Sequence, residues 1–320
     1  MRPKQLLSVL STTLWGTIVF ASSPASENMD KIWQASFSMD PPALHSVKLL
    51  DWNIERGLNL RGIIEFIDRE KPDICFLQEV DFNARRSDYK NIAEELARHF
   101  RFNYVLGIEF EELGQSGSAP AYQGQAILSR LPIRSPRILR FGHQTDFWEP
   151  RWYLPNWSFL QRRRGGRMAL VAEIEIDGTK VIVYDIHLES RMRESGQFQQ
   201  LDEILADITR YPPDVPILLA GDFNSRRVLQ LTQHLTRAGF RDAIGSTQAT
   251  GPSRDAAPVT IFGPLVPPFL RKRMRFNDPC LDWIFARGPL SFEKGRVHQD
   301  VSATDHYPLS VRMSFATPQD

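Results

Sequence analysis

Apolar and polar positions alternate along this chain in two rhythms, one typical of strands and one of helices. Residues 47–53 and 74–80 are apolar runs of strand length, and the segment between them carries Ile63, Ile64 and Ile67 at helical spacing. The same analysis predicts further strands at 102–108, 124–129, 168–176, 180–188, 216–220, 281–286 and 309–315, and helices at 60–69, 89–100, 197–211 and 228–238. This mixture predicts an α/β chain, and no repeat or linker divides it.

Two long stretches follow neither rhythm. Residues 141–167 are aromatic and basic, and residues 257–279 are rich in proline and arginine. Long irregular segments in a folded domain are often binding loops. The other interpretation is a packed surface loop whose aromatic side chains cover neighbouring apolar surface. Both interpretations stand at this point.

The first 25 residues are expected to lie outside the fold. Two basic residues among the first four precede an apolar stretch, 6–20, and small residues follow it. This order is typical of a secretory signal peptide, cleaved after Ala21 or Ala25. The alternative is an uncleaved membrane anchor, for which the apolar stretch is short. We therefore expect an exported protein, periplasmic or secreted, with a signal peptide at 1–25, a leader at 26–45 and one domain at 46–316.

Composition excludes several classes of protein. The chain has 320 residues, of which 42% are hydrophobic and 24% charged, so it is not a disordered chain. Its 39 basic and 38 acidic residues leave a net charge of +1, so an anionic substrate has to be held by local charge or by a metal. The two cysteines, Cys75 and Cys280, are predicted to be separate buried thiols, with a disulfide as the alternative.

Polar residues stand where several apolar strands end. Each has an ordinary explanation when taken alone, because acids and asparagines after strands are usually solvated or cap turns. An acid inside an apolar strand, such as Asp282, costs free energy unless it has a partner. The segments concerned are WNIE (52–55), LQE (77–79), HLE (187–189), GDFN (221–224), LDWIF (281–285) and TDH (304–306).

In that order these segments resemble the motif series of the endonuclease/exonuclease/phosphatase superfamily, over about residues 46–316. The family commonly has serine where this chain has Thr304, and both residues carry a hydroxyl. The resemblance implies an α/β fold (an α+β four-layer sandwich): two packed, mostly antiparallel β-sheets flanked by helices, as in DNase I-like proteins. It also implies divalent-metal-assisted cleavage of phosphoesters at one end of the sandwich.

The resemblance implies a metal site made of oxygen ligands. Glu79 matches the family's metal-binding glutamate, and Asn53 matches the asparagine that helps to hold the metal or the phosphate. Glu55 and Asp305 match positions that complete the acidic surroundings of the metal. Hard carboxylate ligands suit Mg²⁺, with Mn²⁺ or Ca²⁺ as alternatives.

The resemblance also implies the catalytic groups. Asp222 and Asn224 match the pair that orients the attacking water and contacts the scissile phosphate. His306 matches the catalytic histidine, and Asp282 matches the carboxylate that pairs with it and keeps it protonated. His187 matches a second histidine found in DNase and sphingomyelinase members.

The substrate is expected to be a phosphodiester, with nucleic acid favoured over a phospholipid headgroup. Arg164, Arg167 and Trp152, in the basic and aromatic stretch, are the candidate substrate-binding residues, because cations with aromatic rings bind nucleic acid or rest on a lipid surface. The alternatives are a phosphomonoesterase acting on an inositol phosphate or similar small molecule, and a non-catalytic binding scaffold. No obligate protein partner is expected. We expect a monomer, with peripheral membrane contact as a further hypothesis.

Overall fold

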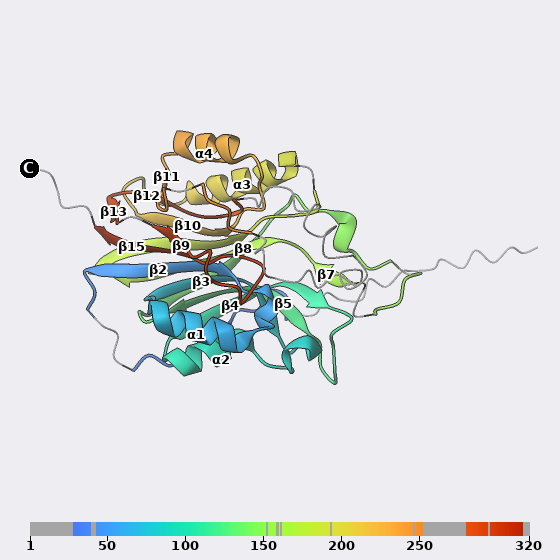
Figure 1. Cartoon of the computed structure of the whole chain (residues 1–320). Coiled ribbons are helices and arrows are strands. Elements are labelled where there is room, and N and C mark those ends of the chain that lie inside the picture. The colour runs from blue at the N-terminus through green and yellow to red at the C-terminus, as the bar shows by residue number, and fades with distance from the viewer. Residues whose placement is uncertain are drawn as a thin grey trace, which may run out of the picture.

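In the computed structural model, two β-sheets pack face to face between two layers of helices (Figure 1). The structure describes residues 28–39, 43–151, 153–157, 160, 162–192, 194–245, 247–251, 280–293 and 295–315. The expected signal peptide, the candidate residue Trp152 and the whole of the stretch 257–279 lie outside the described residues.

The larger sheet has the strand order β1-β4-β5-β3-β2-β15-β13, with β7 paired to β4 and β14 to β15. Neighbouring strands run antiparallel except β2 and β3, which are parallel. The strands are β1 (Trp33–Ser36), β2 (Ser46–Asn53), β3 (Ile74–Phe82), β4 (Asn103–Glu112), β5 (Tyr122–Ser129), β7 (Arg163–Gly165), β13 (Leu290–Phe292), β14 (Arg296–Val297) and β15 (Leu309–Phe315).

The smaller sheet has the order β11-β12-β10-β9-β8-β6, and here only β9 and β10 are parallel. Its strands are β6 (Ile133–Arg140), β8 (Met168–Ile176), β9 (Thr179–His187), β10 (Ile217–Asp222), β11 (Arg241–Asp242) and β12 (Asp282–Arg287). Each sheet therefore has one parallel pair near its middle, β2–β3 in one and β9–β10 in the other. The polar residues that end these strands form the site described below.

Helices cover the outer face of each sheet, α1 (Leu60–Glu70) and α2 (Ile92–Phe100) on the larger one and α3 (Glu194–Ile208) and α4 (Val228–Arg237) on the smaller one (Figure 1). A central apolar layer lies between the sheets, and a second and a third lie under each helix pair. In α1, Ile63, Phe66 and Ile67 are the buried face, and the Asn59 side chain caps the helix by accepting from the Gly62 amide. The described residues thus confirm the expected four-layer, DNase I-like architecture.

Most predicted elements are present within two or three residues of their expected ends. The helix expected from residue 89 begins at Ile92, because Asn91 caps it through the amide of Glu94. Strand β6 was not predicted, because Pro136 and a register irregularity between Arg134 and Arg137 break its alternation. Strand β1 also lies in the expected leader and pairs with β4, so the sheet starts before residue 46.

Both cysteines are buried free thiols, which confirms the prediction for Cys75 and Cys280. Short 3₁₀ turns occur at η1 (Glu55–Gly57), η2 (Arg85–Ser87) and η3 (Asp146–Trp148). Among the helices of the described residues, none is long and apolar enough to cross a bilayer.

Candidate active site

Three candidate residues sit side by side at one end of the smaller sheet. His187 ends β9, Asp222 ends β10 and Asp282 begins β12. Register pairs His187 with Asp222 across the parallel strands, and pairs Asp222 with Asp282 across the antiparallel ones. Strand pairing therefore places these three side chains next to one another across the sheet. Their positions along the chain do not reveal this arrangement.

His306 completes this row from the chain segment before β15. Its Nδ1 atom lies 2.9 and 3.1 Å from the two carboxylate oxygens of Asp282, and both side chains are buried. Burial alone would lower the pKa of His306, but the charge and hydrogen bond of Asp282 outweigh it and raise the pKa well above the usual range. His306 is therefore a buried imidazolium at neutral pH, and its Nε2 atom faces Asp222 at 3.8 Å.

Asp222 lies at the centre of the group. One of its oxygens is 3.3 Å from the Asn53 side-chain nitrogen, 3.7 Å from His187 Nε2 and 3.8 Å from His306 Nε2. Its other oxygen accepts from the backbone amide of Asn224 at 2.9 Å. Burial and the charge of Asp282 raise the pKa of Asp222, and the two histidines oppose this rise. Asn224 has a left-handed φ of 49°, and its side chain donates to the Leu188 carbonyl.

The acidic side of the site is built by the larger sheet. The backbone amide of Glu55 donates to the Asn53 side chain at 3.1 Å, and a Glu55 carboxylate oxygen accepts from the amide of Asp305, also at 3.1 Å. Glu79 stands at an irregularity of β3 between Leu77 and Val80, with φ at 52°. A bulge turns a side chain away from the regular alternation of a strand, and here it carries a partly buried carboxylate.

The charges of these acids are unequal. Burial and the charges of Asp305 and Glu79 raise the pKa of Glu55 to about 7, although Arg56 opposes the rise. Burial and neighbouring charges also raise the pKa of Asp305. For Glu79, burial is outweighed by positive charges, first that of Arg56 at 3.2 Å, and its pKa is lowered. The surroundings thus favour the ionised form of Glu79 and disfavour the ionised forms of Glu55 and Asp305.

The Thr304 hydroxyl links the end of β2 to the segment that carries His306. The hydroxyl oxygen accepts from the Trp52 indole at 2.8 Å, and the hydroxyl lies 3.1 Å from the Asn53 carbonyl and 2.8 Å from the His306 carbonyl. The indole also reaches the His306 carbonyl at 3.0 Å. This hydroxyl therefore connects the strand that ends in Asn53 with the loop that carries His306.

Several charged residues around the site were not singled out from the sequence. Glu109, fully buried in β4, lies 3.4 Å from His187 Nδ1 and also pairs with Arg167. The rule that marks Asp282, an acid within an apolar strand, applies to Glu109 as well and could have found it. Arg56 is different, because only the turn of η1 directs it to Glu79.

The candidate substrate-binding residues lie in ion pairs. Arg167 is buried, with Nη1 at 2.7 and 2.8 Å from the two ring nitrogens of His187 and 3.3 Å from Glu109. Arg164 is partly exposed and lies 3.2 Å from Glu111. Arg167 is therefore buried next to His187 and is connected to the site by its contact with that histidine. The remaining candidates gather around Asp222: Asn53, Glu55, Glu79, His187, Asn224, Asp282, Asp305 and His306.

One set of ligand atoms among the described residues lies close enough together to hold a metal ion. Asp222, Asp282 and His306 each offer one atom, and these atoms lie within 4.8 Å of one another. Glu55, Glu79 and Asp305 form a second group of carboxylates near the Asn53 side chain. Their oxygen atoms are of the kind that hard divalent cations prefer.

The two packed sheets, with histidines and carboxylates at their strand ends, define a phosphoester hydrolase of the DNase I-like class. The chain belongs to the endonuclease/exonuclease/phosphatase family, whose family model matches residues 52–306. No curated protein is significantly similar to it in sequence.

Solved structures share the fold at low sequence identity. An endonuclease/exonuclease/phosphatase from Beutenbergia cavernae has a TM-score of 0.60 at 18% identity, covering 85% of this chain and 72% of that one. A family protein from Bacteroides thetaiotaomicron has a TM-score of 0.59 at 13% identity, covering 86% and 96%. A humanized D. rerio TDP2 with 14 mutations has a TM-score of 0.56 at 16% identity, covering 85% and 100%.

Proposed function

We propose that this protein is a divalent-metal-dependent phosphodiesterase. The observation that carries the proposal is the meeting of a buried His306–Asp282 pair with Asp222, next to a cluster of carboxylates that includes Glu79. A phosphodiester is anionic and repels nucleophiles, so its hydrolysis needs positive charge near the phosphoryl oxygens and a group that handles the proton of water.

The residues of the chain divide these tasks. His306 is held protonated by Asp282, so its Nε2–H can donate to a phosphoryl oxygen and stabilise the charge that develops there. Asp222, held by Asn53 and by the amide of Asn224, is fixed to orient a water molecule or accept its proton. His187 contacts Arg167 and lies beside Asp222, and we propose that it contacts the substrate there.

The oxygen atoms of Glu79, Glu55, Asp305 and Asn53 are proposed to hold the cation, with Mg²⁺ as the expected ion and Mn²⁺ or Ca²⁺ as alternatives. A divalent cation bound there supplies charge neutralisation on the phosphoryl and leaving oxygens. The observation that supports a cation at this place is the gathering of the three carboxylates beside the Asn53 side chain. The Asn53 side-chain N–H donates to Asp222, and the Asn53 side-chain oxygen, which accepts from the Glu55 amide, lies on the acidic side.

Two substrate classes follow from this site. Nucleic acid is the first, as expected from the sequence. That expectation rested in part on Arg164 and Arg167, which lie in ion pairs with Glu111 and Glu109 and so offer less charge to a phosphate backbone. A phospholipid headgroup is the second candidate, and it is favoured by exposed apolar side chains between residues 147 and 160.

The test is hydrolysis by the purified chain of a matched panel. The panel holds double- and single-stranded DNA, RNA, phospholipid vesicles, an inositol polyphosphate and an aryl phosphodiester, each with Mg²⁺ and with EDTA. His306→Ala should abolish any EDTA-sensitive activity, and His234→Ala serves as control, because that histidine pairs with Asp202 on the surface of α4. Absence of turnover throughout the panel, from folded protein that binds Mg²⁺, would favour a binding scaffold instead.

We further propose that the chain is exported through residues 1–25 and acts as a monomer. Export is supported by the order of basic, apolar and small residues at the N-terminus. N-terminal sequencing of the protein recovered outside the cytoplasm, with its mass by light scattering, tests both statements. An intact N-terminus in a membrane fraction would instead indicate the uncleaved anchor.

A further inference from the structure

Large apolar side chains that stay exposed are concentrated in one segment of the described chain. Five of the nine lie between residues 147 and 160, and we name the described residues of this range, 147–151, 153–157 and 160, the aromatic loop. Their exposed fractions are 55% for Phe147, 63% for Tyr153, 41% for Leu154, 57% for Trp157 and 38% for Leu160. Scattered exposed apolar residues are normal, but a group of this kind in one segment indicates an interaction surface.

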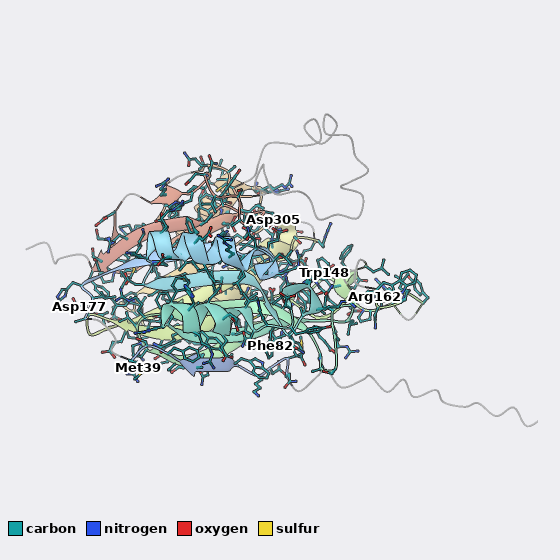
Figure 2. All side chains as sticks on the ribbon, turned by 60° about the horizontal axis from the view of Figure 1, so that its bottom comes forward. Met39, Phe82, Trp148, Arg162, Asp177 and Asp305 are labelled. Atoms are coloured by element: carbon teal, nitrogen blue, oxygen red, sulfur yellow. The ribbon has the colours of Figure 1, made fainter. Side chains whose placement is uncertain are left out.

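The aromatic loop projects from the end of the molecule that carries the candidate site. In Figure 2, Trp148 and Arg162 lie toward one end and Asp177, in the β8–β9 turn, lies at the other, with the segment around Arg162 extending beyond the sheets. Trp148 donates its indole N–H to Glu189 at 3.0 Å, two residues after His187. The loop is therefore attached at its base to the strand end that supplies His187.

Contacts at the base hold the loop in this position. The Arg162 guanidinium donates to the carbonyl of Leu154, and the Arg163 guanidinium stacks on the Trp148 ring at 4.8 Å. Arg163 also lies 2.7 Å from Glu112 on β4. Because the two arginines that make these contacts are buried, the exposed apolar side chains are presented by a supported structure.

Charge around the loop is balanced and does not oppose contact with phospholipid headgroups. Residues 150–161 contain no acid, and Arg151 is their one charged residue. Arg191 lies with its guanidinium 5.1 Å from the Phe147 ring, and it is exposed. The acids at the start of the loop are Asp146, which lies 3.3 Å from Arg151, and Glu149.

We propose that the aromatic loop docks this protein on the surface of a lipid bilayer. Nucleic acid bases stack on aromatic rings, but Leu154 and Leu160 have no ring face to offer, whereas both gain free energy by entering hydrocarbon. Tryptophan and tyrosine favour the boundary between headgroups and acyl chains, and arginines bind headgroup phosphates. Docking requires no turnover, so it goes beyond the proposed activity and can be tested apart from it.

A position-specific fluorescence measurement tests the proposal. Cys75 and Cys280 are buried, so a thiol-reactive fluorophore will label a new surface cysteine selectively. Leu154→Cys places the label on the loop, and Leu229→Cys places it on α4, where Leu229 is the matched exposed control. Both variants are made in the full chain, so the apolar N-terminal segment affects them equally.

The labelled proteins are mixed with vesicles of phosphatidylcholine and phosphatidylglycerol that carry a lipid-bound quencher. Docking predicts a blue shift and quenching at position 154 and neither at position 229. Trp157→Ser, added to Leu154→Cys, should weaken vesicle binding by about tenfold, since one large apolar side chain no longer enters the bilayer.

Equal quenching at both positions, or none at position 154, would overturn the proposal. A response at position 154 to a single-stranded oligonucleotide and not to vesicles would overturn it in favour of a nucleic-acid surface. The fluorescence measurements record binding alone. They therefore remain interpretable if the hydrolysis panel shows no turnover.

Discussion

Asp222 and Asp282 face one another as directly paired residues of two antiparallel strands, β10 and β12. Like charges placed opposite each other in a sheet normally repel. The His306 imidazole reduces this repulsion. Its Nδ1 atom binds Asp282, and its Nε2 atom faces Asp222. The sheet register therefore creates a requirement for positive charge at the point where an anionic phosphoester would be attacked.

This relationship predicts the behaviour of Asp282→Asn. The substitution removes the charge that raises the pKa of His306, so the imidazole loses its proton at lower pH. We expect kcat/KM to fall by about 100-fold or more, and the alkaline limb of the pH–rate profile to move to lower pH. Asp202→Asn is the control, because Asp202 pairs with His234 on the surface. An unchanged alkaline limb would show that His306 does not act as the proposed protonated donor.

The location of the cation can be decided by titration calorimetry with Mg²⁺. Glu79→Gln removes an ionised carboxylate, and we expect it to weaken Mg²⁺ binding by about tenfold or more. Asp282→Asn should change Mg²⁺ affinity little, because Asp282 is occupied by His306. The reverse result would assign the ion to the group formed by Asp222, Asp282 and His306, whose ligand atoms also lie close together.

Thr304 provides a prediction about the framework of the site. Thr304→Ser keeps the hydroxyl that receives the Trp52 indole and should leave activity and stability close to those of the unmodified chain. Thr304→Val removes it and leaves buried polar groups with fewer partners, at a cost of about 1–3 kcal/mol in the free energy of unfolding. Urea denaturation and kcat/KM measure the two effects. Equal stability of the serine and valine variants would contradict the role of the hydroxyl.

His298 predicts an acid-dependent loss of stability away from the site. It is buried between α1 and β15, 2.7 Å from the Ser310 hydroxyl and 3.8 Å from Glu70. Burial lowers its pKa from 6.5 to about 4, with Glu70 opposing. The unfolded chain therefore binds the proton first, and stability should fall as the pH drops from 6.5 toward 4.

His298→Gln should flatten this decline, because glutamine does not titrate. Thermal denaturation over that pH range, with His99→Gln on α2 as control, measures the difference. A parallel decline in His298→Gln and in the unmodified chain would show that carboxylates alone cause it.

The sequence allowed most elements of the fold to be predicted, because each rests on local patterns. The buried face of α1 and the two strands expected at 168–176 and 180–188 follow from the spacing of apolar residues. Strand β6 was missed because Pro136 and its exposed positions give no alternation. Strand β1 was missed because its residues Trp33–Ser36 are short and half exposed, and only their pairing with β4 makes them a strand.

By itself, the sequence determined the elements, the polar strand ends and the resemblance to a family, since these depend on residue types and short spacings. Only the tertiary structure decided which polar groups meet. Asn53 and Asp222 are 169 positions apart, and Trp52 and Thr304 are 252 apart. It also decided that Arg167 is buried behind His187 and that apolar side chains of the aromatic loop remain exposed. The physical reason is that burial and ionisation depend on neighbours supplied by distant strands, which no local pattern encodes.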